Sequence, residues 1–157
     1  MLKKLIKFFS ILSILLIISN QKISEIRYEI KVNNIINNKK EEDYISINNY
    51  KLLIKRGDEK EVLDNNFVYM LPNSDSNNIF LAGHNNKIVF NRIYNLKEND
   101  DIYLNLKGDL QKYTVIERGC IRVNDTKIFL KNDTKMVHLI TCTNNNQKRY
   151  VVKCEKK

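Results

Sequence analysis

This chain of 157 residues contains one proline, four glycines and no tryptophan. So little proline and glycine excludes a collagen-like chain and a proline-rich linker protein. The hydrophobic share of 43% is enough for an ordinary core. The length suits one domain with an appendage.

Acidic residues are absent from the first 24 positions, and this absence explains much of the net charge of +9. Four of the 27 basic residues precede Glu25, and the remaining 23 face 18 acidic residues, which leaves +5. The chain also lacks a basic cluster interleaved with aromatic residues, so we expect no nucleic-acid partner. The charge supports at most a mild attraction to anionic surfaces such as a cell envelope.

A long apolar run occurs only at the N-terminus. Counted from Phe8 to Ile18 it has the length of a signal-peptide core. Counted from Leu2, with the flanking lysines extended to the interface, it reaches about 17 residues, the lower limit for a spanning helix. No small-x-small cleavage pattern follows it, because Ile17 occupies the −3 position. We therefore expect residues 1–19 to be an uncleaved membrane anchor.

The lysines at the front of this segment predict a single-pass protein of the cell membrane, with a cytoplasmic N-terminus and an extracellular domain. A soluble amphipathic helix is disfavoured because the segment is apolar all round.

Residues 20–43 are predicted to form a polar stalk or lead-in helix, and the pattern changes at residue 44. Short β runs follow, separated by turn residues, and this spacing favours a small antiparallel barrel or sandwich over residues 44–157. One exception is residues 88–96, where Val89, Ile93 and Leu96 recur at helical spacing. We expect strands at YISI, YKLLI, NFVYML, NIFLAG, DIYLNL, KYTVIE, IRV, KIFL, VHLITC and RYVVKC.

Three cysteines in an exported chain leave one thiol unpaired. Cys120 and Cys154 are either bridged or buried, and the sequence leaves both alternatives open. A zinc site built from His84, His138, Cys142 and Cys154 would lack the tight ligand spacing of known zinc motifs. We expect no metal site and no cofactor.

Three residues at predicted strand ends, His84, Cys142 and Arg149, are candidates for catalysis. His84 follows an apolar strand and a glycine, so it lies at a strand end, the location of an acid–base group. Cys142 ends a strand, and Arg149 opens the next one, so the two can face each other across a hairpin. A thiol can attack a carbonyl, an imidazole can move the protons, and a guanidinium can stabilise the developing oxyanion.

These residues and their surroundings resemble the sortase family of Gram-positive bacteria. The similar elements are Gly83-His84, the helical stretch 90–96, the turn and strand at 99–102, Tyr113-Thr114-Val115, and Leu139-Ile140-Thr141-Cys142 with Arg149 beyond. The resemblance covers roughly residues 44–154. It implies a mainly β fold, an eight-stranded barrel with one or two short helices behind an N-terminal anchor helix.

The resemblance also implies a cysteine transpeptidase. Cys142 would be the nucleophile, His84 the general acid and base, Arg149 the stabiliser of substrate and oxyanion, and Thr141 a residue that orients substrate. The segment 123–136 would shape the pocket for the sorting signal. Implied partners are surface proteins with a C-terminal signal of the Leu-Pro-x-Thr-Gly type, and an amine acceptor on a peptidoglycan peptide or a pilin lysine.

The chain departs from the family pattern in places. Asn99 replaces a common glycine, His138 opens the strand of the cysteine, and the loop before that strand is short, so the subclass, the calcium dependence and the exact motif stay open. Two other functions are retained. One is an envelope cysteine protease, although in papain-like enzymes the cysteine precedes the histidine. The other is an exported β-barrel binding module with structural cysteines.

Overall fold

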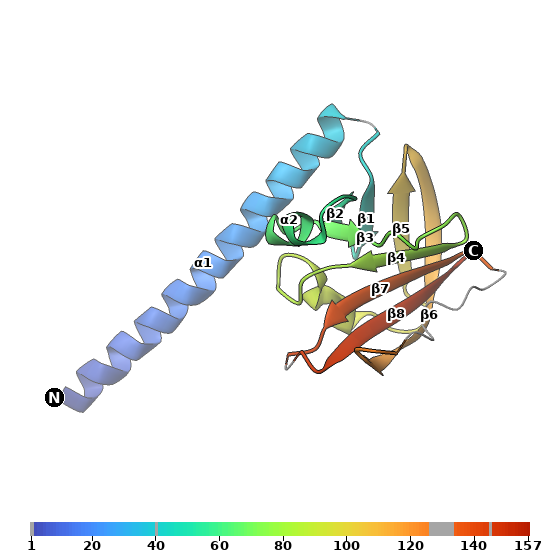
Figure 1. Cartoon of the computed structure of the whole chain (residues 1–157). Coiled ribbons are helices and arrows are strands. Elements are labelled where there is room, and N and C mark those ends of the chain that lie inside the picture. Colours follow the sequence, from blue (N-terminus) through green and yellow to red (C-terminus); the bar gives the residue numbers. More distant parts are fainter. Residues whose placement is uncertain (1, 40, 126–133, 145) are drawn as a thin grey trace.

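The computed structural model describes residues 2–39, 41–125, 134–144 and 146–157. It consists of one long N-terminal helix, α1 (Leu2–Asn38), and a closed barrel of eight strands (Figure 1). The predicted eight-stranded barrel with two short helices is confirmed. The strands are β1 (Tyr44–Ile47), β2 (Tyr50–Lys55), β3 (Val68–Met70), β4 (Asn78–Ala82), β5 (Asp101–Leu106), β6 (Asp109–Arg122), β7 (Met136–Cys142) and β8 (Lys148–Lys156), and the short helices are α2 (Glu59–Asp64) and η1 (Phe90–Asn95).

Two-residue turns close the β1–β2 and β5–β6 hairpins. Asn48 and Asn49 have φ of 50° and 66° between β1 and β2, and Lys107 and Gly108 have φ of 53° and 83° between β5 and β6. Paired positive φ values match the right-handed twist of the flanking strands, and asparagine and glycine tolerate them. The two turns fix the register of the β1–β2 and β5–β6 pairs.

The strand order around the barrel is β1-β2-β3-β4-β7-β8-β6-β5. The expected antiparallel pairing holds for most neighbouring strands but not for all, because β2 pairs with β3, and β4 with β7, in parallel. Parallel neighbours need a crossover connection, and α2 lies within the one from β2 to β3. The Asp58 side chain caps α2 by accepting the amide of Glu61 at 2.9 Å.

The two predicted strands KYTVIE and IRV are a single strand, β6, which is a second correction. β8 pairs along β6 from Lys156 opposite Tyr113 to Lys148 opposite Arg122, and a bulge between Val115 and Glu117 absorbs the irregularity. Because Gly119 is paired with Val151 of β8, β6 continues through this glycine and is not interrupted there. The predicted strand KIFL lies outside the described residues.

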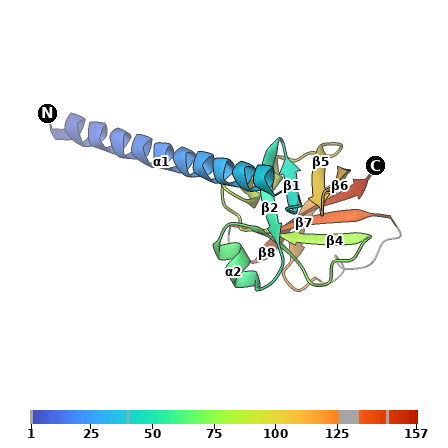
Figure 2. The ribbon, with the colours of Figure 1, turned by 90° about the horizontal axis from the view of Figure 1, so that it is seen from above.

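The barrel interior is closed by apolar side chains from all eight strands and from η1. Val89, Ile93 and Leu96 are fully buried, so the predicted helical spacing there is confirmed. The second half of α1 also packs on the barrel, through Tyr28 and Val32 (Figure 2). The first half extends away from it and exposes its apolar side chains. By length and composition, α1 is the one described helix that could cross a membrane.

Candidate active site

The hairpin of β7 and β8 brings the first two candidate residues together. Cys142 is the last residue of β7, and it pairs with Arg149 in the β8 register, as the sequence predicted. The amide of Thr143 donates to the Lys148 carbonyl at 3.1 Å and closes the turn. Both side chains are half-buried. A thiol and a guanidinium thus occupy neighbouring positions at one end of the barrel.

The end of β4 lies against the same part of β7. The Gly83 amide donates to the Ile140 carbonyl at 3.1 Å, and the Thr141 hydroxyl donates to the Gly83 carbonyl at 2.7 Å. His84 therefore follows a residue that is fastened to the two positions before Cys142. The His84 side chain is exposed, and its carbonyl accepts the amides of Asn86 at 2.9 Å and Phe90 at 3.0 Å. These two bonds shape the loop that presents the imidazole.

Gly83 is required by space and not by its backbone angles. A Cβ at this position would lie 2.8 Å from side-chain carbons of Val89 and Phe90. Heavy atoms of real side chains essentially never approach that closely, so η1 packs directly on the backbone before His84. The close approach holds the loop of His84 onto the core.

Tyr94 is a further residue of this site that the sequence did not reveal. Its hydroxyl donates to the Cys142 carbonyl at 3.2 Å, and its ring stacks on Tyr150 with 4.3 Å between centroids. Burial is the main cause that raises the pKa of Tyr94, so the hydroxyl keeps its proton and remains a donor. No local pattern could have predicted a contact between residues 48 positions apart.

Arg149 keeps its charge available. Among the described residues, its guanidinium contacts two main-chain carbonyls, those of Asn146 and Lys148, both at 3.5 Å. Within the described part of the chain, no carboxylate lies within 4 Å of it. A guanidinium without a carboxylate partner can bind an anionic or polarised oxygen.

His138, the second histidine, has a different environment. It is 1% exposed, it stacks on Phe80 at 4.6 Å, and neither ring nitrogen has a hydrogen-bond partner. Burial, with the nearby Lys153 charge, lowers its pKa to about 4, although Glu117 acts in the opposite direction. An imidazole that is neutral and enclosed at ordinary pH is a poor proton shuttle. Of the two histidines, His84 is the one whose side chain is exposed.

The other two cysteines are free and lie apart. Cys154 pairs with Val115 across the β6–β8 ladder, whereas Cys120 pairs with Tyr150, four residues along β8. Four residues of strand span about 13 Å, well beyond the reach of a disulfide. Cys154 is buried in the core, and burial raises the pKa of its thiol to about 12. It is a structural residue, and its thiol is not reactive at neutral pH.

No group of three or more His, Cys, Asp or Glu side chains in the described ranges could hold a metal ion. The residues that do gather are a thiol, an imidazole and a guanidinium. This set suits attack on a carbonyl, protonation of a leaving group and stabilisation of an oxyanion.

The comparisons with known proteins agree with this arrangement. The sortase domain family matches residues 44–157. Sortase A from Corynebacterium diphtheriae is 25% identical with a TM-score of 0.67, over 74% of this chain and 60% of that one. A Clostridium perfringens sortase D5 transpeptidase is 28% identical with a TM-score of 0.67, over 74% and 78%.

A Clostridium perfringens sortase C is 26% identical with a TM-score of 0.64, over 73% of this chain and 69% of that one. The match thus spans less than two thirds of the Corynebacterium chain. A search of curated proteins found no match. Because the family match covers the entire barrel and the structural neighbours have the same fold, this chain belongs to the sortase family.

Proposed function

We propose that this protein is a membrane-anchored cysteine transpeptidase that cleaves a C-terminal sorting signal and transfers the protein to an amine. The observation that supports it most is the joint placement of three groups. Cys142 and Arg149 are paired across β7 and β8, and Gly83, next to His84, is bonded to the two residues before Cys142.

In the proposed reaction the Cys142 sulfur attacks the scissile carbonyl of the signal and forms a thioester. His84 gives a proton to the leaving amine, and Arg149 stabilises the oxyanion that develops. In the second half, His84 takes a proton from the acceptor amine as this amine attacks the thioester and releases the sulfur. Atoms and charge balance over the two halves, and no cofactor is needed.

The sheet face that carries Cys142 is suited to an extended peptide. Ile140, two residues before the cysteine, joins Phe80 and Val151 in an apolar cluster separate from the barrel core. Successive side chains of a strand alternate between faces, so Ile140 and Cys142 share a face. We infer that the apolar residues of the signal, of the Leu-Pro-x-Thr-Gly type, lie over this cluster.

Thr141 acts on the opposite face. It is buried, and its hydroxyl is engaged by the Gly83 carbonyl. We infer that it positions the loop of His84, and orients substrate only through that loop.

A pocket of about 510 Å³ lies beside the site, between η1 and the β7–β8 turn. No charged side chain lines this pocket. The lining consists of the aromatic ring of Tyr94 and the polar side chains of Asn91, Asn95, Thr143 and Asn144. We infer that the acceptor amine, of a peptidoglycan peptide or a pilin lysine, enters here. An uncharged lining leaves the amine free to lose its proton before it attacks.

The membrane anchor rests on α1. Its first half exposes large apolar side chains, with Phe9 59% and Leu16 58% exposed. Solvent-exposed apolar residues on all sides of a helix are costly in water and favourable in lipid. The lysines at its start support a cytoplasmic N-terminus, which places the barrel outside the cell.

The test is a product assay with the full chain in detergent micelles, a labelled sorting-signal peptide and a range of amines. We expect a new amide product that requires both the amine and Cys142. Cleavage that yields only the free acid, whatever the amine, would favour the envelope cysteine protease. If no peptide is cleaved and Cys142 also resists alkylation in the folded protein, the binding module would be favoured.

A further inference from the structure

The second half of α1 is fixed to the barrel by specific contacts. The Tyr28 ring stacks on Tyr50 with 6.3 Å between centroids, and its hydroxyl donates to the Asn66 carbonyl at 2.8 Å. Val32, one turn further on, is 1% exposed, and the Lys31 ammonium lies 5.8 Å from the centre of the Phe67 ring. A helix held by stacking, a hydrogen bond and a buried valine is a rigid strut and not a loose tether.

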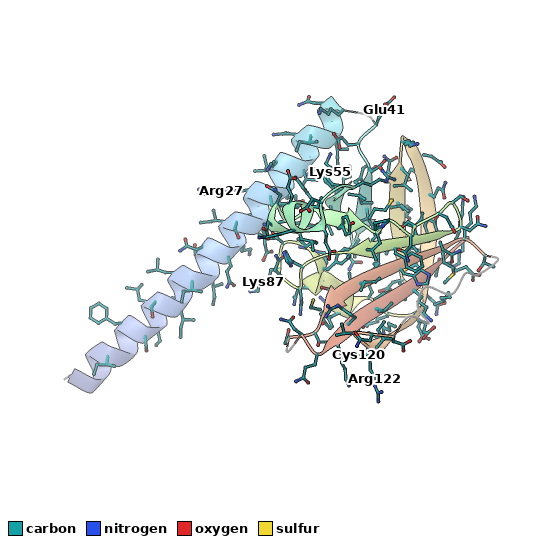
Figure 3. The ribbon with its side chains drawn as sticks, viewed as in Figure 1. Arg27, Glu41, Lys55, Lys87, Cys120 and Arg122 are labelled. Carbon is teal, nitrogen blue, oxygen red and sulfur yellow. The ribbon has the colours of Figure 1, made fainter. Side chains whose placement is uncertain are left out.

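A further contact of α1, nearer its N-terminus than Tyr28, is made with the loop that follows His84. The Lys87 ammonium, three residues beyond His84, donates to the Gln21 side chain at 2.7 Å. Figure 3 shows Lys87 on the side of the barrel that faces α1. The Asn85 amide donates to the Asn144 side chain at 3.0 Å, which joins the same loop to the β7–β8 turn. The active-site end of the barrel is therefore level with Gln21 of α1.

This level coincides with the end of the apolar segment. Ser19 closes the run of exposed apolar residues, and Gln21 lies two residues later. With a rise of 1.5 Å per residue, the two positions differ by only about 3 Å along the helix axis. Figure 1 agrees, since the β7–β8 turn lies on the side of the barrel that faces the N-terminal half of α1. The C-terminus lies on the far side.

The same end of the barrel is basic. The segments 84–92, 142–144 and 146–149, here called the site rim, contain Lys87, Lys148 and Arg149 and no acidic residue. They also contain Arg92, whose guanidinium is stacked on the Tyr50 ring at 3.5 Å. Arg122 pairs with Lys148 in the register and adds a fifth cation, and Figure 3 places it at this end of the barrel. One acidic residue, Asp125, lies near Arg122. The cations outnumber it, so this end as a whole remains cationic. A cationic surface at the level where a helix leaves the bilayer is complementary to anionic lipid headgroups.

We propose that the site rim is a membrane-contacting surface that rests on anionic phospholipid, and that the docking of α1 on the barrel holds it there. The active site then faces the bilayer and works at headgroup level. This inference rests on the membrane anchor of the proposed function, and it adds the orientation of the barrel and the chemistry of the lipid it contacts.

The test measures the distance from the membrane in the full chain, reconstituted in lipid nanodiscs with headgroup-attached nitroxide quenchers. A fluorophore is placed on Asn144→Cys in the site rim, on Lys107→Cys at the opposite end of the barrel, or on Lys22→Cys beside the anchor. The background carries Cys120→Ser and Cys142→Ala, and Cys154 is buried. We expect quenching at positions 22 and 144 to exceed that at position 107 several-fold.

The three positions separate the two claims. Quenching at 22 with equal, weak quenching at 144 and 107 would overturn the proposed orientation and leave the anchor intact. An absence of quenching at 22 would show that α1 is not inserted, which contradicts the anchor itself.

Two further comparisons test the strut and the lipid chemistry. Tyr28→Ala with Val32→Ala should lower quenching at 144 but not at 22. The exposed pair Ile23→Ala with Ile26→Ala is the matched control and should change neither. In discs of phosphatidylcholine alone, quenching at 144 should fall relative to discs that contain phosphatidylglycerol. Equal quenching in the undocked and control pairs would contradict the role of the docking contacts, and equal quenching in the two lipids would contradict recognition of anionic headgroups.

Discussion

The two ends of the barrel differ in what their charged side chains contact. At the end remote from Cys142, Arg56 pairs with Asp43 at 2.8 Å, and Lys55 pairs with Glu42. Asp43 is nearly buried and also accepts the Lys107 amide at 2.8 Å. At the active-site end, Arg149 contacts main-chain carbonyls and no carboxylate of the described residues.

This difference separates cations that are paired with carboxylates from a cation that is not paired with one among the described residues. In these pairs the carboxylates are largely buried and the cations are partly exposed, with Asp43 10% and Arg56 54% exposed at their side chains. The half-buried guanidinium of Arg149 has no carboxylate partner among the described residues, so it can bind an anionic or polarised oxygen. Variants at the active-site end should therefore differ in activity from matched variants elsewhere.

The largest effect is expected from Cys142→Ala. Removing the nucleophile should lower turnover by at least about a thousandfold, because the remaining groups cannot form the thioester. The melting temperature should be unchanged, since Cys142 is half-buried and outside the core. Cys120→Ser is the matched control, a free cysteine of the same end that has no proposed role, and it should retain activity within about twofold. Turnover by Cys142→Ala above a tenth of the wild-type rate would contradict the assignment.

Arg149→Lys should lower kcat/KM by about a hundredfold, because lysine keeps the charge but loses the planar fork that holds an oxyanion. Arg56→Lys at the opposite end is the control. It should leave kcat/KM unchanged and lower the free energy of unfolding by no more than about 1 kcal/mol. Steady-state kinetics and urea titration measure the two quantities. If both variants keep full activity, the unpaired guanidinium has no catalytic role.

Gly83→Ala should destabilise the protein, because its Cβ would lie 2.8 Å from Val89 and Phe90. We expect a loss of about 1–3 kcal/mol in the free energy of unfolding. Turnover should also fall, since the displaced backbone carries His84. Gly119→Ala, with nothing within 4 Å of its Cβ, should be nearly neutral in both measurements. Equal stability of the two variants would mean that the loop of His84 is not held by this close approach.

His138 should make the protein less stable in acid. Its pKa is lowered from 6.5 to about 4, first by burial and then by Lys153, so the unfolded chain binds a proton that the folded protein does not. Stability is then fully present above pH 6.5 and decreases as the pH falls toward 4, by about 3 kcal/mol for this one group. His138→Phe should show a smaller loss over that window in urea titrations at several pH values. An identical pH dependence in the variant would contradict this origin.

Much of this end of the barrel could be predicted from the sequence. The pairing of Cys142 with Arg149 follows from two short strands and the turn between them. The position of His84 follows from a glycine after an apolar strand, and the burial of Val89, Ile93 and Leu96 follows from their spacing. These are local patterns, in which neighbours along the chain determine the structure.

What could not be predicted depends on distant parts of the chain. The Tyr94 contact with Cys142 and the merging of two expected strands into β6 arise from partners far along the sequence. The parallel pairing of β4 with β7 is equally non-local. Residues 20–43 are predicted as a polar stalk or lead-in helix, without contacts to the barrel being foreseen. Tyr28, Val32, Ile35 and Ile36 recur at helical spacing and pack on the barrel. That stripe was the available signal for docking, whereas Ile23, Ile26 and Ile30 remain exposed.

The account depends most on Cys142 as the residue that carries the acyl group. The direct measurement is intact-mass spectrometry of the full chain, incubated with a pool of sorting-signal pentapeptides and mapped by peptide digestion. The account predicts a mass increase that locates to Cys142, equals an acyl fragment of one peptide, and disappears in Cys142→Ala. An adduct on Cys120, or a Cys142 that neither acylates nor alkylates in the folded protein, would contradict it.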